Sequence, residues 1–280
     1  MAVFLALAAA LTYGTADFCG GMATKRTFSS WPVVVVSQLV GLGTVLCLLP
    51  FVHGSGPNLH DLSWGAVGGL VGGIALLAFY RALAVGTMSI VAPVTATLSA
   101  VVPVVAGLAF FGERPGVAAI VGIVAALAAV ALFGVPAQGV TLGSRDISLL
   151  LAAVAGAGFG LFFICLDRTS GHSGLWALVA ARATSTTVLG AAALASGQRL
   201  AITGTTRSLA FVAGVFDSSA NALFLIATHR GLLTTVSVLT SLYPGSTIVL
   251  AYVVLKERLR PPHLVALAVA ILAVALIATA

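Results

Sequence analysis

The chain has 280 residues, of which 60% are hydrophobic and only 7% are charged, and its mean hydropathy is +1.16. A soluble domain carries about 25% charged residues, so this composition excludes an ordinary soluble fold and indicates a protein of the lipid bilayer. The net charge of +6 does not indicate a nucleic-acid partner, because the lysines and arginines stand singly or in pairs at the ends of apolar runs. In such positions they are typical interfacial anchors and topology signals.

The apolar residues fall into ten runs separated by short polar breaks. The first run has the apolar core of a signal peptide but neither a basic segment before it nor a cleavage site after it, so we interpret it as a retained helix. Because about 20 apolar residues cross a bilayer, each run predicts one transmembrane helix of an all-α membrane protein. The predicted helices span residues 3–22, 32–52, 64–86, 89–111, 116–135, 147–166, 175–194, 208–228, 232–255 and 262–279.

The second half of the chain repeats the first. Residues 64–115 recur as residues 208–261, with Gly231 placed 145 positions after Gly86 and Glu257 placed 144 positions after Glu113. This near-constant offset predicts a duplicated unit of five helices. An odd number of helices in each unit turns the second copy upside down in the membrane, which gives two inverted repeats.

Four short motifs are specific enough to compare with known families. They are Phe79-Tyr80-Arg81-Ala82-Leu83, Gly112-Glu113-Arg114-Pro115, Lys256-Glu257-Arg258-Leu259 and Tyr13-Gly14-Thr15-Ala16-Asp17-Phe18. In this order and spacing the motifs resemble those of the drug/metabolite transporter superfamily, specifically its EamA-type ten-helix members. The resemblance implies a first EamA-like five-helix repeat at residues 1–137, a linker loop at 138–146 and a second repeat at 147–280.

Two signals disagree about the orientation in the membrane. The resemblance implies a cytoplasmic N-terminus, and we retain that orientation as the working expectation. It places three single arginines on the cytoplasmic side, whereas the positive-inside rule predicts the opposite orientation. With a cytoplasmic N-terminus, the loops that face outward hold Lys25, Arg26, Arg145, Arg199, Arg207, Lys256, Arg258 and Arg260. The loops that face the cytoplasm hold Arg114, Arg168 and Arg230.

Three ionisable side chains lie well inside the predicted helices: Asp17, Arg182 and Asp217. A charge at the centre of a membrane helix costs about 2.5 to 3.5 kcal/mol on insertion scales, so such groups usually face a partner or a wet cavity. Asn221 follows Asp217 by four residues and shares its helix face. The two residues are a candidate substrate or proton site. The alternative is a buried Asp217 neutralised by an arginine, and the residues alone do not separate these interpretations.

Asp17 follows Tyr13 by one turn, among glycines that leave room for a ligand or for another helix. The resemblance implies that this stretch lines the central pathway. Asp17 departs from the apolar residue or Asn that is common there, which points to cationic or proton-linked substrates. The alternative is a helix-end carboxylate paired with Lys25 or Arg26.

Arg182 matches an arginine that is frequent in the family, and Gln38 occupies the equivalent place in the second predicted helix. The resemblance implies that the second and seventh helices are peripheral. We therefore favour a structural ion pair of Arg182 with Asp217 or Asp17 over a role in the pathway.

The fourth and ninth predicted helices carry hydroxyl groups at spacings of three and four residues, together with prolines. Such stripes are often interhelical contacts, but prolines in a membrane helix leave carbonyl groups that need partners, which favours a cavity lining. The candidates from these helices are Thr95, Ser99, Ser241 and Tyr243, and Tyr80 of the third helix is a further candidate.

Other features predict structure rather than chemistry. Gly65, Gly69 and Gly73 repeat at every fourth residue and predict a close helix crossing. Glu113 and Arg114 follow an apolar run and are expected to be a helix cap and an interfacial anchor. The fifth predicted helix is nearly all Ala, Val, Ile and Leu, and is expected to pack against another helix or face a homodimer partner. The five histidines lie at loop edges without ligand spacing, so we predict no metal site and no cofactor.

Together these observations predict a secondary transporter of the plasma or inner membrane, more specifically an exporter of small organic metabolites or drugs such as amino acids or amines. No Gly-x-x-x-x-Gly-Lys-Ser/Thr loop is present to bind ATP, so Asp17 or Asp217 would exchange a proton with the substrate during alternating access. One alternative is a facilitator or exchanger without proton coupling. Another is a Mg²⁺ transporter. The sequence has only two inner aspartates, which argues against this alternative, because hard cations take six or more oxygen ligands. A membrane-embedded enzyme is not expected, because no catalytic constellation is found.

Overall fold

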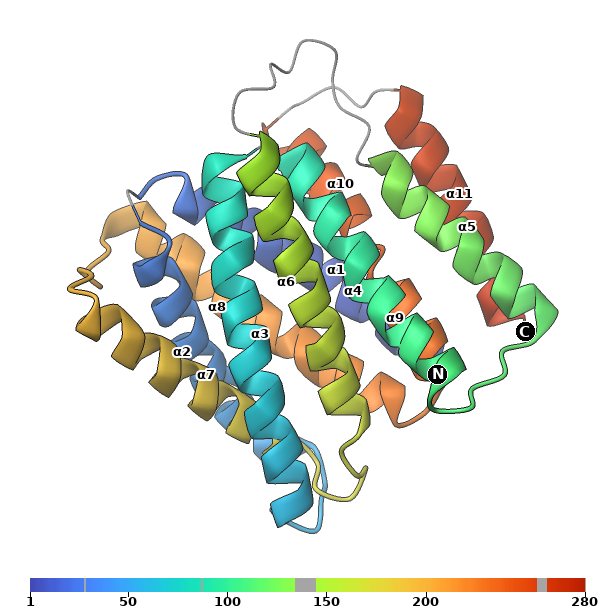
Figure 1. Ribbon diagram of the computed structural model, residues 1–280, viewed down its shortest axis with the longest axis horizontal. Coiled ribbons are helices and arrows are strands. Elements are labelled where there is room, and N and C mark those ends of the chain that lie inside the picture. The colour runs from blue at the N-terminus through green and yellow to red at the C-terminus, as the bar shows by residue number, and fades with distance from the viewer. Residues whose placement is uncertain (28, 87, 134–144, 256–260, 280) are drawn as a thin grey trace.

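The computed structural model describes residues 1–27, 29–86, 88–133, 145–255 and 261–279, and within these ranges the chain is a helical bundle without strands (Figure 1). The first half contains α1 (Ala2–Thr24), α2 (Trp31–Leu48), the 3-10 helix η1 (Leu49–Phe51), α3 (Leu59–Val85), α4 (Met88–Ala109) and α5 (Val117–Phe133). The second half contains α6 (Arg145–Asp167), α7 (Trp176–Ala195), α8 (Gly204–Thr228), α9 (Leu233–Thr240), α10 (Tyr243–Leu255) and α11 (Pro261–Ala278).

Seven helical segments of the described ranges are long and apolar enough to cross a membrane: α1, α2 with η1, α3, α4, α6, α7 and α8. At a rise of about 1.5 Å per residue, helices of this length approach the hydrocarbon thickness of about 30 Å. α5 and the segment 264–278 of α11 are apolar but shorter. The chain is therefore a multi-pass membrane protein, as its composition predicts.

The ninth predicted helix, residues 232–255, is divided in the structure, so the prediction of one continuous helix is wrong. α9 ends at Thr240 and α10 begins at Tyr243. Pro244 favours the break, because it has no backbone N–H to donate to the carbonyl group of Thr240. The intervening turn also has hydrogen bonds of its own, from Leu242 to Leu239 at 3.3 Å and from Gly245 to Leu242 at 2.9 Å.

The third helix begins five residues earlier than the predicted start at Trp64. The side chain of Asn58 accepts a hydrogen bond from the backbone N–H of Asp61 at 2.8 Å, which caps the first turn of α3. Asp61 itself lies in that turn, where a negative charge is favourable. The predicted helix leaves this turn out, and the sequence analysis therefore missed the carboxylate of Asp61, which is fully buried at the start of the helix.

The two halves pack against each other rather than as separate bundles. α3 packs against α6 and α7, and in the corresponding way α8 packs against α1 and α2. α4 contacts α6, while α9 and α10 contact α1, and α5 packs against α11. The corresponding helices are α1 and α6, α2 and α7, α3 and α8, α4 and α9 with α10, and α5 and α11. Exchanging them converts each contact into another observed contact, and converts the contact of α5 with α11 into itself. The fold is therefore a two-repeat arrangement with an internal pseudo-two-fold relation.

Both chain termini lie at the same end of the bundle, which we call the termini end (Figure 1). η1 and the loop before α3 lie at this end, as do the connections from α6 to α7 and from α8 to α9. At the opposite end, α1 ends and α2 begins, and α7 connects to α8. These two ends define the two sides from which a central site can be reached.

The predicted close crossing at Gly65, Gly69 and Gly73 is confirmed, and the partner helix is α7. A Cβ atom on Gly69 would lie 2.5 Å from Cα of Ala181, and one on Gly73 would lie 2.9 Å from Cβ of Ser185. Only glycine fits at such distances, so the backbones of α3 and α7 can approach closely. This approach brings the middle of α7 to the centre of the bundle.

Candidate functional site

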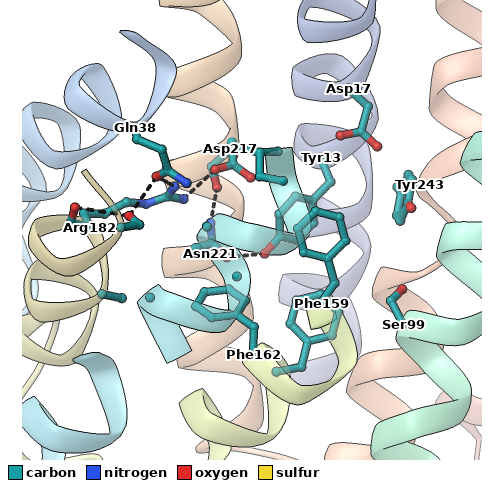
Figure 2. A pocket seen from close by; sticks show the side chains of 17 residues that line it. Tyr13, Asp17, Gln38, Ser99, Phe159, Phe162, Arg182, Asp217, Asn221 and Tyr243 are labelled. Atoms are coloured by element: carbon teal, nitrogen blue, oxygen red, sulfur yellow. Dashed lines mark hydrogen bonds and ion pairs between the residues drawn. The ribbon is translucent and has the colours of Figure 1, made fainter. Parts of the chain in front are cut away.

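A cavity with about 620 Å³ of empty volume lies between the two halves (Figure 2). The walls come from α1, α2, α3 and α4 of the first half and from α6, α7, α8 and α10 of the second. The lining residues are Tyr13, Asp17, Gln38, Gly69, Gly72, Gly73, Leu76, Ser99, Phe159, Phe162, Phe163, Ala181, Arg182, Ser185, Asp217, Asn221 and Tyr243.

Gln38, Arg182 and Asp217 form one polar group in this cavity, which we call the ion-pair group (Figure 2). Nη2 of Arg182 donates to Oδ2 of Asp217 at 2.5 Å, and Nη1 donates to Oε1 of Gln38. The side chains of the pair are only 7% and 19% exposed. The positive charge of Arg182 is thus balanced within the group, and charge-assisted bonds of this kind are the strong ones.

Asn221 joins α8 to Tyr13 of α1. The hydroxyl group of Tyr13 donates to Oδ1 of Asn221 at 2.5 Å, and Nδ2 of Asn221 donates to the main-chain carbonyl of Asp217 at 2.8 Å. Asp217 and Asn221 share a helix face, but the carboxylate contacts α7 and the amide contacts α1. Within the protein they therefore serve different partners.

Asp17, Ser99 and Tyr243 form the second polar group, which we call the Asp17 group; in Figure 2 it lies across the cavity from the ion-pair group. No hydrogen bond or ion pair found within the described ranges involves the carboxylate of Asp17, and its side chain is partly exposed. Lys25 and Arg26 are exposed at the end of α1 and do not pair with it. Asp17 therefore presents an unpartnered carboxylate to the cavity.

The other two members of the Asp17 group are buried hydroxyl groups. Ser99 donates to the carbonyl group of Ala96 at 3.0 Å, within its own helix. Tyr243 reaches the carbonyl group of Ala92 at 3.5 Å, a long and therefore weak contact. The hydroxyl group of Tyr243 thus retains capacity for a further partner.

Aromatic rings cover much of the remaining wall. The ring of Tyr13 lies 6.1 Å from that of Phe163 and 6.4 Å from that of Tyr243, measured between centroids. Phe163 in turn stacks on Phe224 of α8 at 4.1 Å. These contacts hold the three lining rings, from α1, α6 and α10, in place around the cavity, which the glycines of α3 also line.

Three residues of the candidate site lie elsewhere. Thr95 donates to the carbonyl group of Ala152 at 3.2 Å and joins α4 to α6. Tyr80 is 1% exposed and packs against Gly20 of α1, away from the cavity lining. Ser241 donates to the carbonyl group of Val238 at 2.8 Å in the turn after α9. The structure therefore brings together Tyr13, Asp17, Ser99, Arg182, Asp217, Asn221 and Tyr243, and leaves these three in helix packing.

The expectation that the second and seventh helices are peripheral is wrong for this cavity. Gln38 of α2 and Arg182 of α7 both line it, because the glycines of α3 let α7 approach the centre. Gln38 and Arg182 are 144 positions apart, which is the repeat offset. Gln38 and Arg182 therefore occupy equivalent positions of the two repeats, and their side chains meet at the centre of the bundle.

The sequence analysis also missed the aromatic and glycine walls. Phe159, Phe162 and Phe163 of α6 and Gly72 of α3 line the cavity. The repeat offset of 144 to 145 residues was the available signal, because it maps Asp17 to Phe162 and Asp217 to Gly72. The positions in the other repeat that correspond to Asp17 and Asp217 therefore point to the aromatic wall and to the glycine wall.

At the termini end, hydrogen bonds join the two halves directly. Asp61 accepts from the backbone N–H of Ser170 at 2.7 Å and from its hydroxyl group at 2.6 Å. The backbone N–H of Ser55 donates to the carbonyl group of His172 at 2.7 Å. These links tie the start of α3 to the connection between α6 and α7.

Glu113 makes a third link at this end. Its two carboxylate oxygens accept from the backbone N–H groups of Leu233 at 2.7 Å and Thr234 at 3.0 Å. Glu113 is thus a helix cap, as expected, but it caps α9 of the second half. At the opposite end, the hydroxyl group of Ser29 donates to Gln198 at 2.9 Å and also joins the halves.

Within the described ranges, no three His, Cys, Asp or Glu side chains lie close enough together to hold a metal ion. The two aspartates that line the cavity belong to separate polar groups, and one of them is already paired with an arginine. The arrangement suits recognition of an organic solute by charge, hydrogen bonds and aromatic contact.

Comparison with known proteins adds two findings. The EamA-like transporter family matches residues 1–135 and 146–279. A solved protein titled "Crystal structure of protein" is similar with a TM-score of 0.76 and 19% identity, over 98% of this chain and 95% of that chain. This similarity supports the fold alone. No curated protein matches the chain.

Proposed function

The chain belongs to the EamA-like transporter family, and from that premise we propose that it is a secondary transporter that carries small organic solutes through the central cavity by alternating access. The observation that carries this proposal is the unpartnered carboxylate of Asp17, which faces a cavity built from both repeats. An ionisable group within a membrane bundle typically marks a substrate or proton pathway.

Asp17 is the proposed coupling residue. Without a partner, an ionised carboxylate in an apolar bundle is unfavourable, so a proton or a cationic group of the substrate stabilises it. If only one of them occupies Asp17 at a time, each displaces the other. Asp217 is less suited to this exchange, because Arg182 already compensates its charge at 2.5 Å.

Export is the proposed direction. A proton that enters down an inward gradient and binds Asp17 would release the substrate. Substrate that binds in the next transport cycle would then release the proton. Such an exchange moves substrate against the proton flow and needs no ATP site. The proposed inverted repeats would supply the two alternating conformations by rocking around the cavity.

Hydrogen bonds between the halves at both ends of the bundle support alternating access. Three hydrogen-bonded links between the halves close the termini end, at Asp61, Ser55 and Glu113. At the opposite end, the hydroxyl group of Ser29 donates to Gln198 and links the halves. In the proposed cycle, the links at the termini end break when that end opens. Contacts between the halves then form at the opposite end, at positions related to the broken links by the pseudo-two-fold relation.

The test is transport by the purified full chain in liposomes with an internal pH indicator. From a panel of amines and amino acids, we expect at least one solute to drive proton release in the wild type, and Asp17→Asn to abolish that release. Asp167→Asn is the matched control, because that carboxylate lies at the end of α6 and pairs with Arg168; it should retain proton release.

Two outcomes would contradict the proposal. Failure of every solute to move under its own gradient would overturn the assignment as a transporter. Solute movement that ignores both the proton gradient and Asp17→Asn would overturn the coupling and leave a facilitator or exchanger.

A further inference from the structure

We infer that the cavity selects organic monocations, meaning amines or quaternary ammonium ions with an apolar or aromatic body, over acids and zwitterions. The inference rests on the proposed function in one respect, since it takes the central cavity as the substrate site. It goes further by naming the chemical class of the substrate from the charges and rings that line the cavity.

The charge balance of the lining carries the first step. Asp17, Asp217 and Arg182 are the lining residues that bear a formal charge, so two negative charges face one positive charge. Arg182 is engaged by Asp217 through one nitrogen and by Gln38 through the other. One negative charge, that of Asp17, is therefore left for the substrate to compensate.

The same geometry disfavours a substrate carboxylate. A carboxylate group in an apolar site needs a cation or several N–H donors to replace water. The guanidinium group that could supply them is already committed to the ion-pair group, and Asp17 offers only acceptor oxygens. An acid would be repelled, and a zwitterion would leave its carboxylate without a partner.

The rings beside Asp17 favour a cation independently of its carboxylate. Tyr13 has Phe163 and Tyr243 within 6.1 and 6.4 Å, centroid to centroid, so three rings surround one side of the cavity. The faces of aromatic rings attract ammonium groups, most strongly where water is excluded. An ammonium head can therefore lie between Asp17 and the rings, with the apolar body of the substrate along Phe159 and Phe162 (Figure 2).

A matched panel of four small molecules tests this inference on the purified full chain. They share a phenyl ring and a short chain but differ in charge: 2-phenylethylamine is a cation, phenylalanine a zwitterion, 3-phenylpropionate an anion and 2-phenylethanol neutral. Binding is measured by calorimetry at neutral pH. We expect 2-phenylethylamine to bind at least tenfold more tightly than each of the other three.

Two variants assign the preference to Asp17. Asp17→Asn should remove the tenfold preference, so that 2-phenylethylamine and 2-phenylethanol bind alike. Asp167→Asn, the control outside the cavity, should retain it. Benzyltrimethylammonium should behave like the amine, because it carries a charge but no proton that it could donate.

The possible results separate this inference from the proposed function. Tighter binding of phenylalanine or 3-phenylpropionate, or no binding of any probe, would overturn the cation selectivity even if other solutes are transported. A preference for 2-phenylethylamine that survives Asp17→Asn would overturn the role of Asp17. The expected preference without transport would support the site but overturn the transporter assignment.

A second inference comes from the surface charge of the two ends, which is independent of the cavity. The geometry points to an orientation with the opposite end in the cytoplasm and both termini on the other side. Among the described side chains of the opposite end, five cationic ones are exposed and no carboxylate accompanies them. The five are Lys25, Arg26, Arg81, Arg199 and Arg207.

Among its described side chains, the termini end has no such excess. Its three arginines are matched by three carboxylates, and one pair is in direct contact, Arg168 with Asp167 at 2.7 Å. The positive-inside rule places the cationic end in the cytoplasm. This orientation is the reverse of the working expectation from the family resemblance. The residues at the termini end are Arg114, Arg168 and Arg230, with Asp61, Glu113 and Asp167.

Reporter fusions to the C-terminus of the full chain test the orientation in a bacterial host. Alkaline phosphatase is active only outside the cytoplasm, whereas green fluorescent protein fluoresces only inside it. We expect an active phosphatase fusion and a dark fluorescent fusion. A variant with Lys25, Arg26, Arg199 and Arg207 all changed to Gln should raise the fluorescent signal. A fluorescent wild-type fusion, or equal signals from both reporters, would overturn the inference.

Discussion

Asp17 and Asp217 are the same residue type, line the same cavity and come from helices that pack against each other, yet their surroundings differ. Asp217 receives a hydrogen bond from Arg182 at 2.5 Å, and that arginine is also held by Gln38. Asp17 has no such partner among the described residues. The difference teaches that a position inside a membrane bundle does not by itself leave a carboxylate available to a ligand or a proton; the carboxylate must also lack a partner within the protein.

The largest expected effect follows from removing the partner of Asp217. Arg182→Met should lower the free energy of unfolding by about 3 to 5 kcal/mol, because it leaves an uncompensated buried charge. The loss can be measured as a fall in the thermal unfolding midpoint of the detergent-solubilised protein. A double variant, Arg182→Met with Asp217→Leu, should recover most of the stability, since it removes both charges. No recovery would mean that Arg182 acts through contacts other than Asp217.

The next effect tests whether Asp217 sets the charge of the cavity. Asp217→Asn should free Arg182 while Asp17 keeps its charge, so the cavity would then offer both an anionic and a cationic group. We expect phenylalanine to bind about tenfold more tightly than to the wild type, which corresponds to about 1.4 kcal/mol. Calorimetry with the panel described above measures it. An unchanged order of affinities would show that Arg182 is not available to ligands.

A smaller effect is expected from the hydrogen bond between the two aspartate-bearing helices. Tyr13→Phe should cost about 1 kcal/mol of stability, because the amide oxygen of Asn221 loses its donor. Tyr243→Phe is the matched comparison, and it should have little effect, because its hydroxyl contact is 3.5 Å long. Thermal unfolding of the two variants side by side measures the difference. Equal losses would contradict the assignment of the bond to Asn221.

The smallest expected change is in the stability of Asp17→Asn. A side chain without a partner contributes no ion pair, so its neutral isostere should unfold at the same temperature as the wild type or slightly above it. Thermal unfolding of Asp17→Asn beside Asp217→Asn checks this contrast directly. A clear loss of stability in Asp17→Asn would mean that the carboxylate has a structural partner and would remove the distinction between the two residues.

Much of the site could be predicted from single residues. Asp17, Arg182 and Asp217 stand out because charges inside long apolar runs are rare, and the structure places all three at one cavity. Thr95, Tyr80 and Ser241 were equally plausible by residue type, but they lie in helix packing. A hydroxyl group carries little cost in lipid when it bonds to its own or a neighbouring backbone, so sequence alone does not tell a lining group from a packing group.

The amino-acid sequence was sufficient for the class of the protein, the position of most helices and the duplication, because hydrophobic run length and repeat offset are local or periodic properties of the chain. The break before α10, the inward position of α7 and the cap of α9 by Glu113 depended on contacts between distant segments. Pairing was decided in the same way: Asp217 and Arg182 meet because glycines on α3 let two helix backbones approach. Whether a buried charge has a partner is a property of three-dimensional packing, and that property separates Asp17 from Asp217.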